Sequence, residues 1–346
     1  MQTKLFSTKR IVLIAILGIS IWILIPKIIG LKDTVELLNR VIFWAFILAL
    51  LSEFFFYIGS AILTQTVLKM TKDKLSFWDV LKISVMDSFS VQFLPLGTLG
   101  EAAVDYYFYR AKNIRTTHIF LMFVARTIIV WLVFGLIYLV GVAFAPSNGE
   151  LSGDKLLIIW LIYAGGVGVF TYFIYLYSKR WLLLKRANRF VEILNFFANL
   201  FHRNKISLDK IPGFVDKIYE AIWILSQNIR LQITAGIGAL FFWFGDIFCL
   251  YFAFLGFGYS PHLAIVIFTY AVAKIISTLS FIPGGLGITE AIMSLIFIGF
   301  GIPAPIALAA VLIFRLISFW LPIPVGFVSF LSLQRNYNKI KVEGII

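Results

Sequence analysis

Residues 281–290 read Phe-Ile-Pro-Gly-Gly-Leu-Gly-Ile-Thr-Glu, and a similar stretch at residues 93–101 reads Phe-Leu-Pro-Leu-Gly-Thr-Leu-Gly-Glu. Each stretch interrupts an apolar run, and an arginine, Arg315 or Arg126, follows 25 residues after its glutamate. Proline removes a backbone donor and glycine permits turns that other residues resist, so a continuous helix must break at both places. The chain therefore carries a duplicated broken helix with an acid just after each break.

The composition places this duplication in a membrane. The chain has 346 residues, of which 61% are hydrophobic and only 14% are charged. A soluble protein of this size could not cover so much apolar surface with so few charged groups. Its single cysteine excludes an internal disulfide, and its three histidines are too scattered to suggest a metal cluster. We therefore expect an all-α polytopic membrane protein with no metal and no other cofactor.

Six apolar runs are long enough to cross about 30 Å of hydrocarbon, which takes roughly 20 residues. They cover residues 11–29, 41–65, 118–145, 155–178, 231–256 and 304–333. Two composite segments lie between these runs, at residues 77–109 and 262–303, and each contains one of the Pro/Gly breaks. We read both composite segments as re-entrant broken helices rather than as full spans.

The distribution of lysine and arginine orients the predicted spans. Basic residues gather at both termini, in the 66–82 loop and in residues 179–230, whereas residues 146–154 carry none. Six crossings with both termini in the cytoplasm satisfy the positive-inside rule at these loops. The first re-entrant segment then opens to the cytoplasm and the second to the outside.

The whole chain, residues 1–346, is accordingly predicted to be a single transmembrane domain with an inverted repeat. The first repeat covers about residues 41–145 and the second about residues 231–333, an architecture associated with alternating access around a site near the bilayer midplane. In the alternative, both composite segments cross fully and the repeats run parallel. That arrangement moves the most basic loop, within residues 179–230, to the outside.

The basic segment 179–230 is predicted to form two amphipathic helices on the cytoplasmic side. Apolar residues recur at helical spacing in both halves of the segment, with lysines and arginines away from them. Such helices lie on an anionic leaflet, where each basic residue near the surface adds about 1 kcal/mol. Solvated cytoplasmic helices that simply obey the positive-inside rule are an equally good reading.

The breaks and their paired arginines supply the candidate site. A helix that restarts inside a membrane exposes amides with a positive dipole end, which suits an anion such as phosphate. Arg126 and Arg315 each cost about 2.5–3.5 kcal/mol at a helix centre, so both should face the bundle interior and find partners. The residues that we assign to substrate binding and translocation are Glu101, Arg126, Glu290, Arg315, Gly97, Gly100, Gly285 and Gly287, with Pro95 and Pro283 as the structural breaks.

Two interpretations of these residues remain open at the level of sequence. In one, the arginines and glutamates line a path for a phosphate-bearing lipid headgroup; in the other, Glu–Arg pairs lock the re-entrant segments in place. No residue is assigned as catalytic, and the absence of a Gly-Lys dipeptide excludes a P-loop. Five further charged residues near or within apolar runs are weaker candidates: Glu53, Asp87, Asp105, Asp246 and Lys274.

The chain resembles the transmembrane domain of lysylphosphatidylglycerol synthases, which also occurs in stand-alone flippase-like membrane proteins. The similarity covers about residues 10–333 and is most specific in the second half. It is carried by Phe281–Glu290, Gly301–Pro303, Ala307–Ala310 and Arg315–Pro322 in that half, and by Pro95, Gly97, Gly100, Glu101 and Arg126 in the first. The first half departs from the family pattern at Ala125, at Val130 and at Asp105, where a basic residue is usual.

The resemblance implies movement of a lipid between leaflets, without the soluble aminoacyl-transfer domain of the full-length synthases. We therefore expect a flippase or transporter that moves an anionic or phosphate-bearing lipid, a phospholipid or a polyprenyl-phosphate-linked lipid, without ATP. The alternatives are a membrane-embedded enzyme of lipid-phosphate or acyl chemistry and a scaffold for lipid-synthesis enzymes. The expected location is the cell membrane, and the expected partners are membrane lipids and a separate lipid-synthesis enzyme, not nucleic acid.

Overall fold

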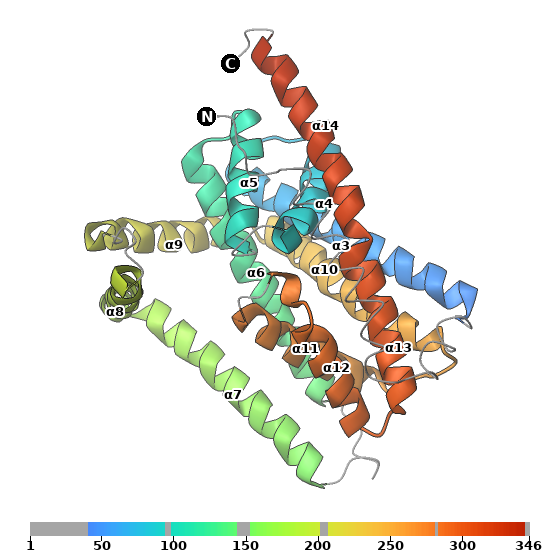
Figure 1. Cartoon of the computed structure of the whole chain (residues 1–346). Helices are drawn as coiled ribbons and strands as arrows, with labels where there is room; N and C mark the ends of the chain where they lie inside the picture. Colours follow the sequence, from blue (N-terminus) through green and yellow to red (C-terminus); the bar gives the residue numbers. More distant parts are fainter. Residues whose placement is uncertain (1–40, 94–97, 144–152, 201–206, 281–282, 343–346) are drawn as a thin grey trace.

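The structure is a computed structural model that describes residues 41–93, 98–143, 153–200, 207–280 and 283–342. Every regular element in these ranges is a helix (Figure 1). The first predicted repeat contains α3 (Phe43–Met70), α4 (Phe77–Phe93), α5 (Thr98–Ala111) and α6 (Thr116–Ala143). The second contains α10 (Ile229–Leu255), α11 (Leu263–Leu279), the short turn η2 (Pro283–Gly285), α12 (Ile288–Gly299), α13 (Ala304–Arg315), η3 (Leu316–Trp320) and α14 (Pro322–Val342).

Four helices in the described ranges are long and apolar enough to span a bilayer. They are Phe43–Met70, Thr116–Leu139, Ile229–Leu255 and Ala304–Arg335, which match four of the six predicted spans. The run predicted at 155–178 forms α7 (Gly153–Ser178), and the run at 11–29 lies outside the described residues. The protein is an all-α polytopic membrane protein.

The centre of the molecule is the crossing of α3 and α10. Glycines allow the two backbones to touch: a Cβ on Gly59 would lie 2.4 Å from the backbone nitrogen of Phe242, and one on Gly245 would lie 2.5 Å from that of Phe56. Small residues at such a crossing let helices associate in lipid, where no hydrophobic force drives them together. The start of α3 also meets the end of α10, because the Ile42 amide donates to the Gly256 carbonyl over 2.8 Å.

The helices α4 and α5 form a hairpin, so the start of α4 and the end of α5 lie at the same end of the molecule. Lys112, just after α5, pairs with Asp79 at the start of α4 over 2.9 Å. His118 at the start of α6 contacts Asp73, in the turn before α4, over 2.7 Å. The hairpin therefore opens at the end where α3 stops and α6 begins.

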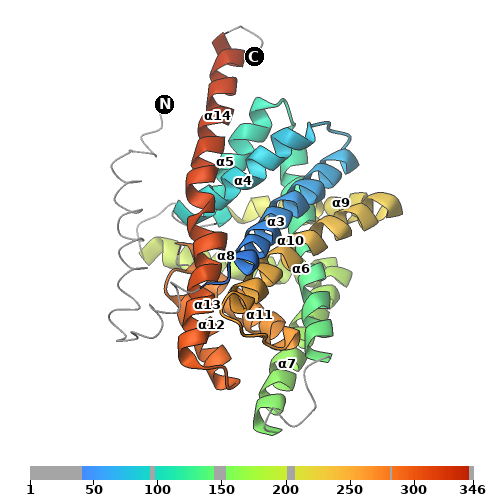
Figure 2. The ribbon, with the colours of Figure 1, turned by 90° about the vertical axis from the view of Figure 1, so that its right-hand side faces the viewer.

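The helices α11 and α12 form a second hairpin at the opposite end. Phe297, near the end of α12, packs edge-on against Phe254, near the end of α10, with the ring centroids 4.6 Å apart. Phe254 also contacts Tyr259, which precedes α11. Because the end of α10 adjoins the start of α3, the two hairpins open at opposite ends, as Figure 2 also shows.

The contacts between the two halves come in matched pairs. The central helices α3 and α10 pack on each other, α4 packs on α14, and α11 packs on α6. If each helix of one half is replaced by its counterpart in the other half, the α4–α14 contact becomes the α11–α6 contact. The α3–α10 contact stays the same. A glycine allows the close approach of α4 and α14, since a Cβ on Gly326 of α14 would lie 2.7 Å from the Val85 carbonyl oxygen of α4.

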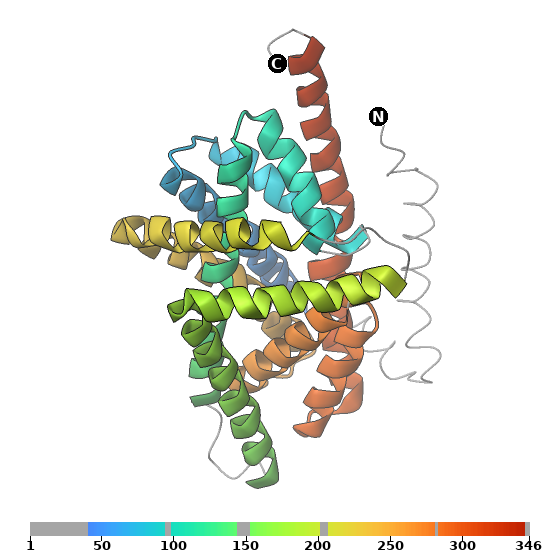
Figure 3. The same ribbon diagram turned by 90° about the vertical axis from the view of Figure 1, so that its left-hand side faces the viewer.

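The segment between the halves forms α8 (Arg180–Leu200), η1 (Leu208–Lys210) and α9 (Ile211–Ser226). In Figure 3, α8 and α9 run across the view while α14 runs along its long axis. The helix α8 exposes both basic and large apolar side chains, among them Lys185, Arg189, Trp181 and Phe190. The two amphipathic helices predicted in 179–230 are thus present as helices.

Candidate functional site

The second break is built from glycines that adopt conformations other residues resist. Gly284, Gly285 and Gly287 have φ values of 59°, 62° and 81°. A side chain would also collide there, since a Cβ on Gly284 would lie 2.1 Å from the Phe319 ring and one on Gly285 would lie 1.8 Å from Ser277 Oγ. Space and backbone conformation together require the Gly-Gly-x-Gly spacing.

This turn positions Glu290 as both a helix cap and an ion-pair partner. The Gly287 amide donates to Glu290 Oε2 over 2.7 Å, which satisfies an amide at the start of α12. Arg315 Nε donates to the other oxygen, Oε1, over 2.7 Å, and Arg315 Nη2 donates to the Gly284 carbonyl over 2.9 Å. One arginine therefore holds the glutamate and the turn at once.

A local widening of the helix follows Arg315. The residues of η3 form a π-helical turn in which the Leu321 amide donates to the Leu316 carbonyl over 2.9 Å. Pro322 follows directly, and a proline cannot continue the regular ladder because it lacks an amide donor. The turn places the Phe319 ring 4.2 Å from the Arg315 guanidinium carbon, which adds a cation–π contact.

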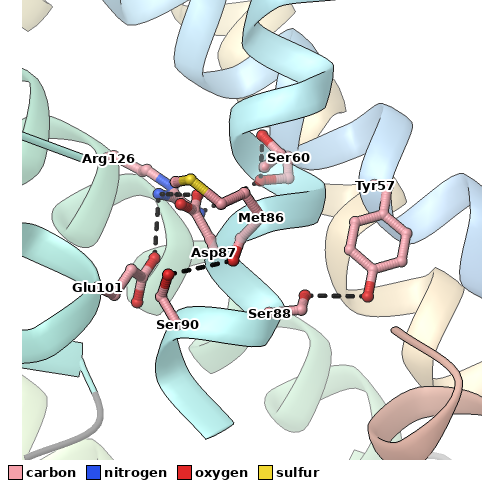
Figure 4. Close-up of polar contacts among 9 residues, drawn as sticks. Tyr57, Ser60, Met86, Asp87, Ser88, Ser90, Glu101 and Arg126 are labelled. Atoms are coloured by element: carbon pink, nitrogen blue, oxygen red, sulfur yellow. Dashed lines mark hydrogen bonds and ion pairs between the residues drawn. The ribbon is translucent and has the colours of Figure 1, made fainter. Parts of the chain in front are cut away.

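The first half holds its arginine differently. Arg126 Nη1 lies 3.5 Å from Glu101 Oε1 and 3.8 Å from Asp87 Oδ2, and Nη2 donates to Ser60 Oγ over 3.2 Å (Figure 4). Ser60 in turn donates to Ser84 Oγ. The arginine is thus shared among three helices, α3, α4 and α5, at longer distances than those around Arg315.

Three acids converge beside Arg126. Asp87, Glu101 and Asp105 each offer an oxygen within 4.8 Å of the others. Asp105 is fully buried, and its carboxyl group lies against that of Asp87, with no basic or backbone donor bonded to either of its oxygens. We refer to Asp87, Glu101, Asp105 and Arg126 as the first cluster; it contains three acids and one base.

A second group of ionisable residues, the central cluster, lies where α10 crosses α3 and meets α11. Its members are Glu53, Asp246 and Lys274. Tyr270 donates to Asp246 Oδ2 over 2.5 Å, while Asp246 Oδ1 and Glu53 Oε2 are buried without a partner. Lys274 acts electrostatically on both acids and also on Glu101 of the first cluster.

The two hairpins are in contact with each other. The turn η2 packs against α4, and Leu286 joins a small apolar cluster with Phe89 of α4 and Phe319 of η3. Glu101 lies in the first turn of α5, just after the first break, and Glu290 lies in the first turn of α12, just after the second. The acidic ends of both broken helices therefore lie in the interior of the helical bundle.

The structure pairs each predicted glutamate with its predicted arginine. Gly100 lies in the first turn of α5, whereas Pro95 and Gly97 lie outside the described residues. Two of the weaker candidates from the sequence, Asp87 and Asp105, lie beside Arg126, and Ser60, which the sequence did not indicate, also contacts it. The signal for Asp105 was available, because it follows Glu101 by four residues and so shares its helix face.

The chain is similar to known membrane proteins. The family model described as the lysylphosphatidylglycerol synthase TM region matches residues 11–326. A UPF0104 membrane protein of Pyrococcus horikoshii is 23% identical over 91% of this chain and 94% of its own length. Another, of Methanocaldococcus jannaschii, is 23% identical over 70% of each chain. The chain belongs to the lysylphosphatidylglycerol synthase transmembrane-region family.

Proposed function

We propose that this protein moves an anionic or phosphate-bearing lipid between the leaflets of the cell membrane without ATP. The observation that carries the proposal is the pair of hairpins that open at opposite ends and contact each other, each with a Glu–Arg pair whose glutamate lies in the first turn of its second helix. A buried arginine attracts a phosphate, and two hairpins open to opposite sides offer a route from either leaflet.

The topology that goes with this function is an inverted repeat of about residues 41–145 and 231–333 in one transmembrane domain. The hairpins α4–α5 and α11–α12 are the two re-entrant elements, and both termini face the cytoplasm. The matched pairing of α4 with α14 and of α11 with α6 supports this reading, since a two-fold exchange of the repeats maps one contact onto the other. The exposed basic and apolar residues of α8 suit the cytoplasmic leaflet.

The two arginines divide the roles that the sequence left open. Arg315 is committed to Glu290, to the Gly284 carbonyl and to the Phe319 ring, so we assign it to locking the second hairpin. Arg126 has no acid closer than 3.5 Å among the described residues and shares its charge between Glu101 and Asp87. A guanidinium held in this way can exchange a distant carboxylate for a bidentate phosphate contact.

A proteoliposome assay tests the proposal. Purified protein is reconstituted with fluorescent phosphatidylglycerol or with a neutral glycolipid of the same acyl chains, and a membrane-impermeant quencher reports the exchange between leaflets. We expect phosphatidylglycerol to exchange faster than in protein-free vesicles. Arg126→Gln should slow that exchange about tenfold or more, because a charge-assisted hydrogen bond contributes roughly 1.5–3 kcal/mol.

The control is Arg180→Gln, which removes an exposed arginine of α8 and should leave the rate unchanged. A rate equal to that of protein-free vesicles, or an Arg126→Gln rate equal to that of the wild type, would contradict the proposal. Faster exchange of the neutral lipid would contradict the assigned headgroup class.

The alternative is a membrane enzyme that acts on a lipid phosphate or acyl chain, and the three convergent carboxylates of the first cluster favour it. Incubation with labelled lipid extract followed by mass spectrometry separates the two functions. A transporter leaves its lipid chemically unchanged, whereas an enzyme yields a product whose formation depends on Asp87 and Asp105.

A further inference from the structure

The first cluster carries more negative charge than its arginine can balance. Asp87, Glu101 and Asp105 bring three carboxylates within 4.8 Å of one another, and Arg126 supplies one positive charge. With all four groups ionised the net charge is −2. Isolated charges of this kind are very costly to bury unless they are paired or coordinate a metal.

A separate observation points to a missing partner for these acids. Asp105 has no exposed surface, and its carboxyl group lies against that of Asp87 with no basic or backbone donor bonded to either of its oxygens; Oδ1 of Asp87 is likewise buried without such a donor. Arg126 makes its contacts with Asp87, Glu101 and Ser60. Buried polar atoms are nearly always satisfied, so carboxyl oxygens that lie within 4.8 Å of other carboxyl oxygens and lack a donor require either a bound cation or protons.

Lys274 does not supply the missing charge. It interacts electrostatically with Glu101, but it also interacts with Glu53 and Asp246 of the central cluster. Those two acids alone exceed its single charge, and its ammonium group also lies 5.9 Å from the centre of the Trp243 ring. The excess charge of the first cluster therefore persists.

We propose that Asp87, Glu101 and Asp105 bind one divalent hard cation of the Mg²⁺ or Ca²⁺ class. The ligand set contains only carboxylate oxygens, which these ions prefer, and one divalent ion balances the net charge of −2. Metal–oxygen distances of about 2.0–2.6 Å place oxygens on opposite sides of an ion roughly 4–5 Å apart, which fits the observed spread.

The placement of the ligands gives the ion a defined structural role. Asp87 belongs to α4, whereas Glu101 and Asp105 lie one turn apart on the same face of α5. A cation among them joins the two arms of the first hairpin across its break. In the second hairpin Arg315 performs the corresponding task by holding Glu290 and the turn. The proposed ion site does not depend on lipid transport.

Titration with Mn²⁺, followed by electron paramagnetic resonance of the free ion, tests the site on the full chain in detergent. We expect one Mn²⁺ bound per chain, displaced by Mg²⁺ or Ca²⁺, and a higher melting temperature when the ion is present. Asp105→Asn keeps the shape of the side chain and should weaken Mn²⁺ binding at least tenfold. Asp246→Asn, which changes a buried acid of the central cluster, should bind Mn²⁺ like the wild type.

Further measurements keep the test decisive. The melting temperature of Asp105→Asn in chelator shows that the variant is folded, and Asp87→Asn provides a second variant with the same expected loss. Absence of saturable Mn²⁺ binding, or equal binding by wild type and Asp105→Asn, overturns the proposal. Stabilisation by acidification with no response to Mn²⁺ or Ca²⁺ also overturns it, because protons alone would then balance the charge.

Discussion

The two halves of this molecule place the same pair of residues at the same spacing and use them differently. In the second half, Arg315 and Glu290 approach to 2.7 Å, and the guanidinium also contacts the Gly284 carbonyl and the Phe319 ring. In the first half, Arg126 stands 3.5 Å from Glu101, and two further acids crowd beside it. The same Glu-to-Arg spacing therefore gives a short ion pair with further contacts in one half, and a longer ion pair beside additional acids in the other.

Breaking the ion pair between Arg315 and Glu290 should have the largest effect on stability. Arg315→Met leaves Glu290 charged and buried without its base, and loss of one partner of a buried ion pair costs about 3–5 kcal/mol. We therefore expect a large fall in the melting temperature in detergent. The double variant Arg315→Met with Glu290→Gln should recover part of that loss, because it removes both charges. A single variant as stable as the wild type would contradict the assigned role.

The glycine turn of the same half should show the next largest effect. Gly285→Ala introduces a side chain at φ 62°, where its Cβ would overlap Ser277 Oγ. Backbone strain and overpacking together should lower the free energy of unfolding by about 2–4 kcal/mol. Gly299→Ala is the matched control, since a Cβ there meets nothing within 4 Å. Equal melting temperatures for the two variants would show that the turn tolerates a side chain.

Charge removal should have the opposite sign in the first half. With divalent cations chelated, Asp105→Asn relieves repulsion among three acids and should raise the free energy of unfolding by about 1 kcal/mol. Glu290→Gln, by contrast, should lower it, because Glu290 is fully used by Arg315 and Gly287. Melting curves of both variants in chelator provide the comparison. Destabilisation by both substitutions would mean that Asp105 already has a partner.

Sequence alone offered the two Glu–Arg pairs as one of two interpretations, because the spacing of 25 residues appears twice and an arginine inside a membrane needs a partner. It also predicted the helices α3, α6, α7 and α10. It could not predict that Asp87 joins Glu101, since that contact depends on how α4 packs against α5. Nor could it bring Glu53 to Asp246, because the glycine contacts that set the α3–α10 crossing depend on three-dimensional register.

The smallest effect should come from the shortest ion pair in the described part of the chain. Arg180 Nη2 lies 2.6 Å from Asp216 Oδ1, closer than either membrane arginine lies to its acid, but both side chains are more than half exposed. Water screens such a pair, so Arg180→Ala should change the free energy of unfolding by less than about 1 kcal/mol. A double-mutant cycle with Asp216→Ala measures the coupling free energy of this pair. We attribute the difference in strength between the ion pairs to burial rather than to distance. A coupling free energy near that of Arg315 with Glu290 would refute this view.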